Sequence, residues 1–149
     1  MTGGRNLSEK GATLYSDKVA VRLSRDEFDA LVERAVAGIP PGFRAQMANL
    51  AIVVETCGPE PDLLGLYEGR PLTERSVLDP LGTPDRIRIF QRAHQEMARS
   101  RRELEQIVAD TVWHEVGHYF GLGEREIHDI EARRERRGAL AALRSLRRR

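Results

Sequence analysis

The chain has 149 residues, of which 40% are hydrophobic and 32% are charged, and its formal net charge is +1. This length and composition fit one soluble globular domain with a core of its own, and a net charge near zero does not by itself indicate a nucleic-acid or membrane partner. The single cysteine, Cys57, excludes an internal disulfide and a zinc site built from cysteines.

Positive charge is concentrated at the C-terminal end. Residues 131–149 contain eight Arg and two Glu, so this segment carries +6 and the preceding residues together carry −5. Such a segment could attract nucleic acid or another acidic partner. We favour a solvated, partly frayed helix over that function, and we treat 131–149 as an Arg-rich tail.

The N-terminal segment, residues 1–18, is polar and rich in Gly, Ser and Thr. We expect a poorly ordered leader here, and the segment lacks the apolar core of a signal peptide. No stretch of the sequence approaches the roughly 18 apolar residues that a membrane helix requires. These features predict a cytoplasmic protein without a membrane partner, and they leave residues 19–130 as the folded domain.

The first half of that domain predicts one helix and two strands. Ser24 has the features of a helix N-cap, with Glu27 completing a capping box, and Gly38 followed by two prolines ends the helix. A short β-branched run and a second apolar run, each bounded by turn residues, predict the strands. The two predicted strands are residues 50–54 and 63–67.

The second half predicts a further strand and two more helices. Residues 86–90 alternate between polar and apolar, which is typical of a half-exposed strand near the edge of a sheet. From Arg101 the apolar positions follow helical spacing until Gly121. A last helix of about 20 residues starts at Glu124 and enters the tail. Two or three helices around a small sheet give an α+β domain.

The segment that carries most chemical information is His114-Glu115-Val116-Gly117-His118. Side chains four residues apart on a helix lie one above the other, so both imidazoles can reach one ion at the roughly 2.0–2.1 Å that zinc prefers. Glu115 lies beside this pair, where it can act as general base toward a metal-activated water. The spacing therefore predicts Zn²⁺ held by His114 and His118, with Glu115 as the catalytic residue.

A catalytic zinc usually has a third protein ligand. Gly121 allows a sharp turn after the helix, and Glu124 follows it in the register where related motifs place a third histidine. Glu124 is therefore the predicted third ligand. Glu126 and His128 remain competitors, because a loop or a new helix could bring either side chain inward.

Four further residues have an alternative interpretation. Asp110, one turn before the motif, could accept a hydrogen bond from a ligand histidine, but we favour a solvated side chain. We expect His94 at the surface or at the rim of a cleft, and not as a ligand. The hydroxyl groups of Tyr67 and Tyr119 could stabilise an oxyanion, although core or rim packing is favoured for both.

The motifs together resemble the small bacterial proteins of the zincin-like metallopeptidase family, over roughly residues 22–128. The segments that carry the resemblance are 24–28, 49–54, 64–69, 84–90, 114–121 and the acidic cluster around Glu124. The sequence departs from the family pattern at Glu124, where the family usually has Asp. No methionine follows Met97, so the Met-turn of larger metzincins is absent.

The resemblance implies a fold as well as a site. It implies a zincin-like α+β domain in which the zinc helix packs under a small mixed sheet. It also implies that the strand at 86–90 borders the cleft and could pair with an extended peptide.

Two functions follow from these observations. The first is a zinc-dependent, peptidase-like hydrolase that acts on peptides or proteins. The alternative is a non-catalytic zinc-binding module whose basic tail holds a nucleic-acid or protein partner. Structural zinc sites usually take all four ligands from the protein, often from cysteine, and the motif has no cysteine near it. The first function is therefore favoured, and the oligomeric state is left open.

Overall fold

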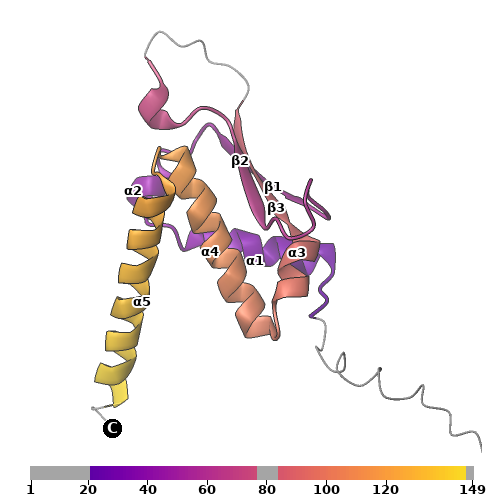
Figure 1. Ribbon diagram of the computed structural model, residues 1–149, viewed down its shortest axis with the longest axis vertical. Coiled ribbons are helices and arrows are strands. Elements are labelled where there is room, and N and C mark those ends of the chain that lie inside the picture. The colour runs from indigo at the N-terminus through magenta and orange to yellow at the C-terminus, as the bar shows by residue number, and fades with distance from the viewer. Residues whose placement is uncertain (1–20, 77–83, 147–149) are drawn as a thin grey trace, which may run out of the picture.

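The computed structural model describes residues 21–76 and 84–146, and the leader expected at 1–18 lies outside these ranges. The described chain is an α+β domain in which a small sheet packs against helices (Figure 1), as the sequence predicts. In chain order the elements are α1 (Arg25–Ala37), α2 (Pro41–Arg44), β1 (Leu50–Glu55), β2 (Gly65–Glu68), the 3₁₀ turn η1 (Leu72–Glu74), β3 (Asp85–Phe90), α3 (Gln91–Met97), α4 (Arg101–Tyr119) and α5 (Glu124–Leu146).

Within the described residues the sheet has three strands, in the order β1-β3-β2. β1 runs parallel to β3, with Ile52 opposite Ile87, and β2 runs antiparallel to β3, with Tyr67 opposite the same isoleucine. The sheet is therefore mixed, as expected. The prediction that residues 86–90 lie near an edge is wrong, because β3 is the central strand and pairs on both sides.

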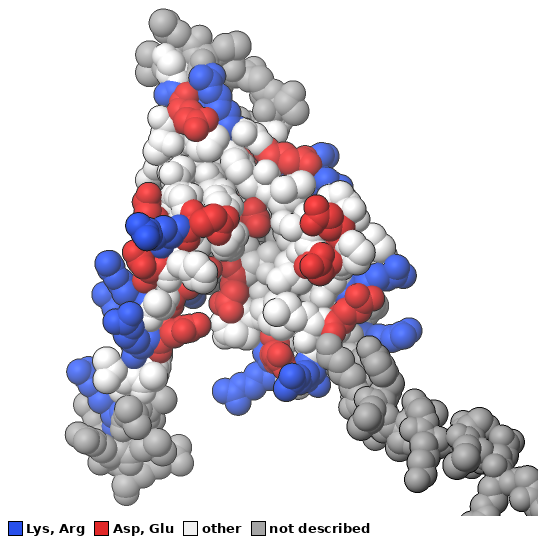
Figure 2. Space-filling model, in the orientation of Figure 1, with Lys and Arg blue, Asp and Glu red and all other residues white. Residues whose placement is uncertain are grey.

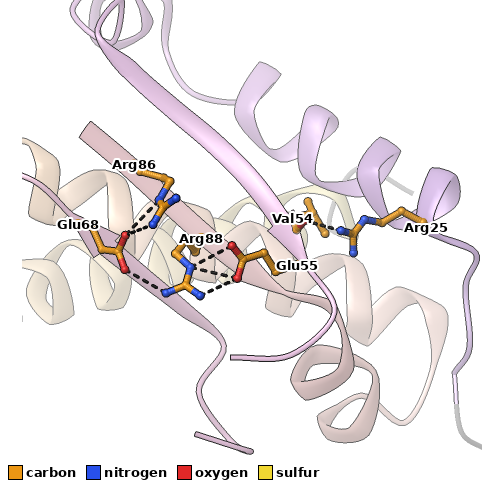
Figure 3. Close-up of polar contacts among 6 residues, drawn as sticks. All are labelled: Arg25, Val54, Glu55, Glu68, Arg86 and Arg88. Carbon is orange, nitrogen blue, oxygen red and sulfur yellow. Dashed lines mark hydrogen bonds and ion pairs between the residues drawn. The ribbon is translucent and has the colours of Figure 1, made fainter. Parts of the chain in front are cut away.

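The alternation of polar and apolar residues in β3 reports the two faces of the strand, not its place in the sheet. Ile87 and Ile89 are fully buried in the core. Arg86 and Arg88 point to the opposite face, where glutamates of both neighbouring strands pair with them (Figure 3). Arginines can lie on a central strand here because their partners occupy the same face.

One arginine links all three strands. The Arg88 guanidinium contacts Glu55 of β1 at 2.7 Å and Glu68 of β2 at 3.0 Å, and Arg86 adds a contact with Glu68 at 2.6 Å. Hydrogen bonds from these arginines lower the pKa of both glutamates. Charge pairs therefore support the strand register on one face, and apolar packing supports it on the other.

α4 contributes one continuous apolar side to the core. It packs on β2 and β3 of the sheet and on α1 and α3. The buried side chains of this side recur at every fourth residue: Leu104, Val108, Val112 and Val116. Full burial of such a side chain contributes about 1.5–3 kcal/mol. This packing therefore fixes the rotation of α4 about its own axis.

α1 begins where the sequence predicts. The Ser24 hydroxyl accepts a hydrogen bond from the Glu27 N–H, and the Glu27 carboxylate accepts one from the Ser24 N–H, which completes the capping box. The Arg25 side chain then donates to the Val54 carbonyl of β1 at 2.5 Å, as Figure 3 shows. The start of α1 is thus tied to the sheet.

α3 follows β3 directly, and its seven residues are too short to show an apolar period. It carries His94, which is fully buried, so the expectation of a surface or rim position is wrong. Its Nδ1 lies 2.7 Å from the Phe90 carbonyl and its Nε2 lies 2.9 Å from the Thr111 hydroxyl. A carbonyl only accepts, so Nδ1 carries the proton of the neutral ring, and the Thr111 hydroxyl, which also lies 2.9 Å from the Ile107 carbonyl, can give its one hydrogen to either acceptor. Burial lowers the pKa of this imidazole.

α5 continues through residue 130, where we expected the domain to end and the tail to begin. Figure 1 shows the helix beside α4 near its start and diverging from it afterwards. Residues 133–141 are all exposed, and arginines along this part of α5 are prominent in Figure 2. In the described ranges, no helix is both long enough and apolar enough to cross a membrane.

His94→Leu should lower the free energy of unfolding by about 1–3 kcal/mol, because the Phe90 carbonyl loses a buried donor. The folded-state pKa of His94 lies below its unfolded value, so the unfolded chain takes up the proton first on acidification. Wild-type stability should therefore fall as the pH is lowered through the unfolded pKa of about 6.5, and the fall should be smaller in the variant. Urea unfolding in EDTA measures the free energy of unfolding at each pH without a contribution from bound metal.

His128→Leu is the matched control, because it removes a histidine whose side chain is 83% exposed. It should leave both the stability at neutral pH and its pH dependence close to the wild type. The same pH dependence in His94→Leu and in the wild type would contradict the assignment of His94 as a neutral core residue.

Candidate metal centre

Two histidines lie one turn apart on the side of α4 that faces α5. The ring centroids of His114 and His118 are 4.9 Å apart, and both side chains are partly exposed. The core side of α4 is fully packed, so the helix cannot rotate to turn these rings away. The imidazoles are held toward the start of α5.

The chain reverses directly after the histidines. The Gly121 N–H donates to the His118 carbonyl at 2.9 Å, and the Leu122 N–H donates to the Gly117 carbonyl at 3.0 Å, which closes the end of α4. Gly121 has φ of 84°, and a Cβ there would overlap the Thr73 side chain of η1. Only glycine meets both conditions, and the turn that it makes brings the next helix back to the histidines.

Glu124, the first residue of α5, places its carboxylate beside both imidazoles. Its Oε1 lies 2.8 Å from His118 Nε2 and 3.2 Å from His114 Nε2, and the two nitrogens are 3.2 Å apart. Ligands that bind one zinc ion tetrahedrally at about 2.0–2.1 Å lie about 3.3 Å from one another. The three atoms therefore fit one zinc ion in chemical type and in spacing. Within the described ranges, they form a group of metal-binding side chains close enough to share an ion.

The two competing candidates for the third ligand lie elsewhere. Glu126 is exposed and is not part of the converging group. His128 is also exposed, and its Nδ1 lies 3.9 Å from Glu131. The structure brings Glu124, and not these residues, to the histidine pair.

Glu115 is buried between α4 and β2. Its Cγ would lie 3.1 Å from a Cβ at Gly65, and its carboxylate accepts a hydrogen bond from the backbone N–H of Tyr67. Burial raises the pKa of Glu115, and the two neighbouring histidines offset this rise only in part. A carboxyl group with a raised pKa is closer to the range in which it can take and release a proton at neutral pH.

The Glu124 carboxyl is shifted in the opposite direction. Burial acts to raise its pKa, but the charges and hydrogen bonds of His114 and His118 outweigh this effect and lower it. The carboxylate form is the one that binds a metal. The two acidic groups therefore differ: the pKa of Glu124 is lowered, which favours its charged form, and the pKa of Glu115 is raised, which favours its protonated form.

The hydroxyls of Tyr67 and Tyr119 form hydrogen bonds within the domain. The Tyr67 hydroxyl donates to Asp85 at 2.5 Å, and the Tyr119 hydroxyl donates to the Gln46 carbonyl at 2.8 Å. The two rings also contact each other edge to face, with centroids 6.2 Å apart. These contacts agree with the packing role that the sequence favours.

The carboxylate behind His114 is Glu131, which the sequence analysis missed. Its Oε1 lies 3.7 Å from His114 Nδ1. Asp110, the residue considered for this place, is exposed and accepts a hydrogen bond from Gln106 at 2.9 Å. The sequence could have identified Glu131 by its spacing, because a residue seven positions after Glu124 returns to the same face of the helix.

A match to known proteins covers the same elements. Residues 47–134 match a family described as zincin-like metallopeptidase. This range is more than half of the chain, and it includes the sheet, α4 and the first part of α5. No curated protein matches the chain.

Glu124→Ala should weaken zinc binding by more than about 100-fold, because loss of a direct ligand costs more than the 10–100-fold typical of a residue behind a ligand. Glu126→Ala removes the same charge from an exposed position two residues later, and it should change the affinity by no more than about twofold. Competition with a fluorescent chelator measures both. A larger loss of affinity in Glu126→Ala than in Glu124→Ala would show that Glu124 is not the third ligand.

Gly121→Ala should lower the free energy of unfolding by at least about 1–2 kcal/mol, because the positive φ alone costs that much for a residue with a Cβ. The overlap with Thr73 adds to this cost. Gly123→Ala is the control, since a Cβ there meets nothing within 4 Å. Urea unfolding of the two variants should separate them, and equal losses would show that the turn does not require glycine.

Proposed function

The chain belongs to the zincin-like metallopeptidase family, and we propose that it is a zinc-dependent peptidase whose site is formed by α4, the start of α5 and β2. The observation that carries this proposal is the convergence of three ligand-type atoms beside a buried glutamate. The convergence supplies a place for the metal, and the glutamate supplies a base.

In this proposal His114, His118 and Glu124 hold the zinc ion. Zinc in such a site lowers the pKa of a bound water to near 7 and polarises a substrate carbonyl. Three protein ligands are typical of catalytic zinc, whereas structural zinc usually takes four. This difference supports a hydrolase over the alternative of a non-catalytic zinc-binding module.

Glu115 acts as the general base. The Tyr67 N–H bonds its carboxylate within the site, beside the two histidines. Because it does not belong to the converging ligand group, its oxygens remain free to take the proton of the attacking water. The same group can then deliver that proton to the leaving amine.

The outer edge of β2 is the proposed place for the substrate backbone. The Phe90 N–H donates to the Leu64 carbonyl at 2.9 Å, which sets the alternation of ladder hydrogen bonds between β2 and β3. By that alternation, Gly65 and Tyr67 direct their backbone groups away from β3. Because the Tyr67 N–H is bonded to the Glu115 carboxylate, an extended peptide can pair with this edge beside α4 through the Gly65 backbone groups and the Tyr67 carbonyl. The pairing expected at residues 86–90 is wrong, because β3 already has a strand on each side.

Glu115→Gln should keep the zinc and the fold but lower the rate of peptide hydrolysis by about 10²–10⁴. The amide has the same size, and its oxygen can still accept from the Tyr67 N–H, but it cannot take a proton. Cleavage of a peptide library, followed by mass spectrometry, measures the rate, with zinc content determined on the same samples.

Glu126→Gln is the matched control and should cleave at the wild-type rate. Full activity in zinc-loaded Glu115→Gln would overturn the role of Glu115 as base. If zinc-loaded wild-type protein cleaves no peptide in the library, the peptidase itself is overturned, while the metal site stands.

A further inference from the structure

Over the first three or so turns of α5, before it diverges from α4, side chains on one face of α5 contact α4. The residues of this face are spaced by three, four and three positions: Glu124, Ile127, Glu131 and Arg134. Ile127 is buried against Gly117 of α4, where an added Cβ would lie 2.9 Å from its Cγ1. The Arg134 guanidinium lies 4.5 Å from the centroid of the Trp113 ring. The contacts of Ile127 and Arg134, which flank Glu131 on the same face, therefore fix the position of Glu131 along α4.

That register places Glu131 behind the ring of His114. One ring nitrogen, Nε2, faces Glu124 at 3.2 Å, and the other, Nδ1, lies 3.7 Å from Glu131 Oε1. A neutral imidazole that binds a metal through Nε2 carries its proton on Nδ1, so the N–H then faces this carboxylate. At 3.7 Å the contact is electrostatic and longer than a hydrogen bond.

The second histidine has an acceptor of a different kind. His118 Nδ1 lies 3.2 Å from the Leu122 carbonyl, so the backbone of the Gly121 turn supplies its acceptor. Ligand histidines generally donate their second N–H to a carbonyl or a carboxylate, which fixes the ring and makes it a better ligand. For His114 the corresponding acceptor is the Glu131 carboxylate. Because this acceptor belongs to a side chain, its role can be tested by substitution.

We propose that Glu131 is a positioning residue of the metal centre, which accepts the Nδ1–H of His114 and holds its Nε2 toward Glu124. This inference rests on the proposed function, because it requires His114 to bind a metal. Its other contact, with the exposed His128, is weak in water and does not compete. α5 then serves the site twice, with a ligand in its first turn and an orienting carboxylate two turns later.

The test is the zinc affinity of the full chain and of four variants, measured by competition with a fluorescent chelator. Glu131→Ala should bind zinc at least about 10-fold more weakly, within the 10–100-fold range of such partners. Glu131→Gln should lie between that variant and the wild type, because its amide oxygen still accepts but carries no charge. Glu135→Ala and Glu135→Gln remove the next acidic side chain of α5, and they should stay within about twofold of the wild type.

A second measurement separates orientation from general stability. The visible absorption of the cobalt-substituted protein reports the geometry of the ligands around the ion. Glu131→Ala should change this spectrum, and Glu135→Ala should not. The thermal unfolding midpoints of metal-free Glu131→Ala and Glu135→Ala should agree, because without the metal Glu131 has no ligand to orient. If Glu131→Ala does not fold, Glu131→Gln and Glu135→Gln provide the same comparison.

The outcomes distinguish this inference from the function on which it rests. A wild-type chain that binds no zinc overturns both. A wild-type chain that binds zinc, with Glu131 and Glu135 variants of equal affinity and equal cobalt spectra, overturns the role of Glu131 alone. A loss of affinity in Glu131→Ala with an unchanged cobalt spectrum would also overturn it, because the effect would then come from charge and not from the orientation of His114.

Discussion

The packing of α4 against the sheet is the contact on which both the core and the metal centre depend. Its apolar side, from Leu104 to Val116, is buried on β2, β3 and α1. Because that side cannot turn, the opposite side of the same helix must present His114 and His118 away from the core. The burial that stabilises the domain therefore also sets the side of α4 on which the two histidines lie.

Two glycines set how closely the other elements approach α4. At Gly65 a Cβ would lie 2.8 Å from Thr111 Cγ2, so β2 reaches the helix only because this residue has no side chain. That closeness allows the Tyr67 N–H to bond the carboxylate of Glu115. On the other side, Gly117 admits Ile127 of α5. Close approaches on two sides of α4 thus place β2 beside Glu115 and the start of α5 beside the histidines.

Charge is arranged differently in two polar clusters of the described residues. On the outer face of the sheet, Arg88 is paired with glutamates of both neighbours, and the cluster is balanced within itself. At the metal centre, Glu115, Glu124 and Glu131 lie around the imidazoles of His114 and His118. A concentration of carboxylates around two imidazoles is electrostatically suited to a cation. The first cluster supports the strand register, and the second offers atoms of the kinds that bind a metal ion.

The sequence by itself determined the elements whose signals are local. The capping box at Ser24, the β-branched strand β1 and the i, i+4 histidines of α4 depend on contacts within a few residues, so their patterns can be read directly. The register after Gly121 likewise pointed to Glu124. Only the tertiary structure decided that β3 is central, that His94 is buried and that Glu131 lies behind His114. Each of these three features depends on contacts between segments that are far apart in the sequence. Such contacts leave no periodic pattern in the sequence of either segment.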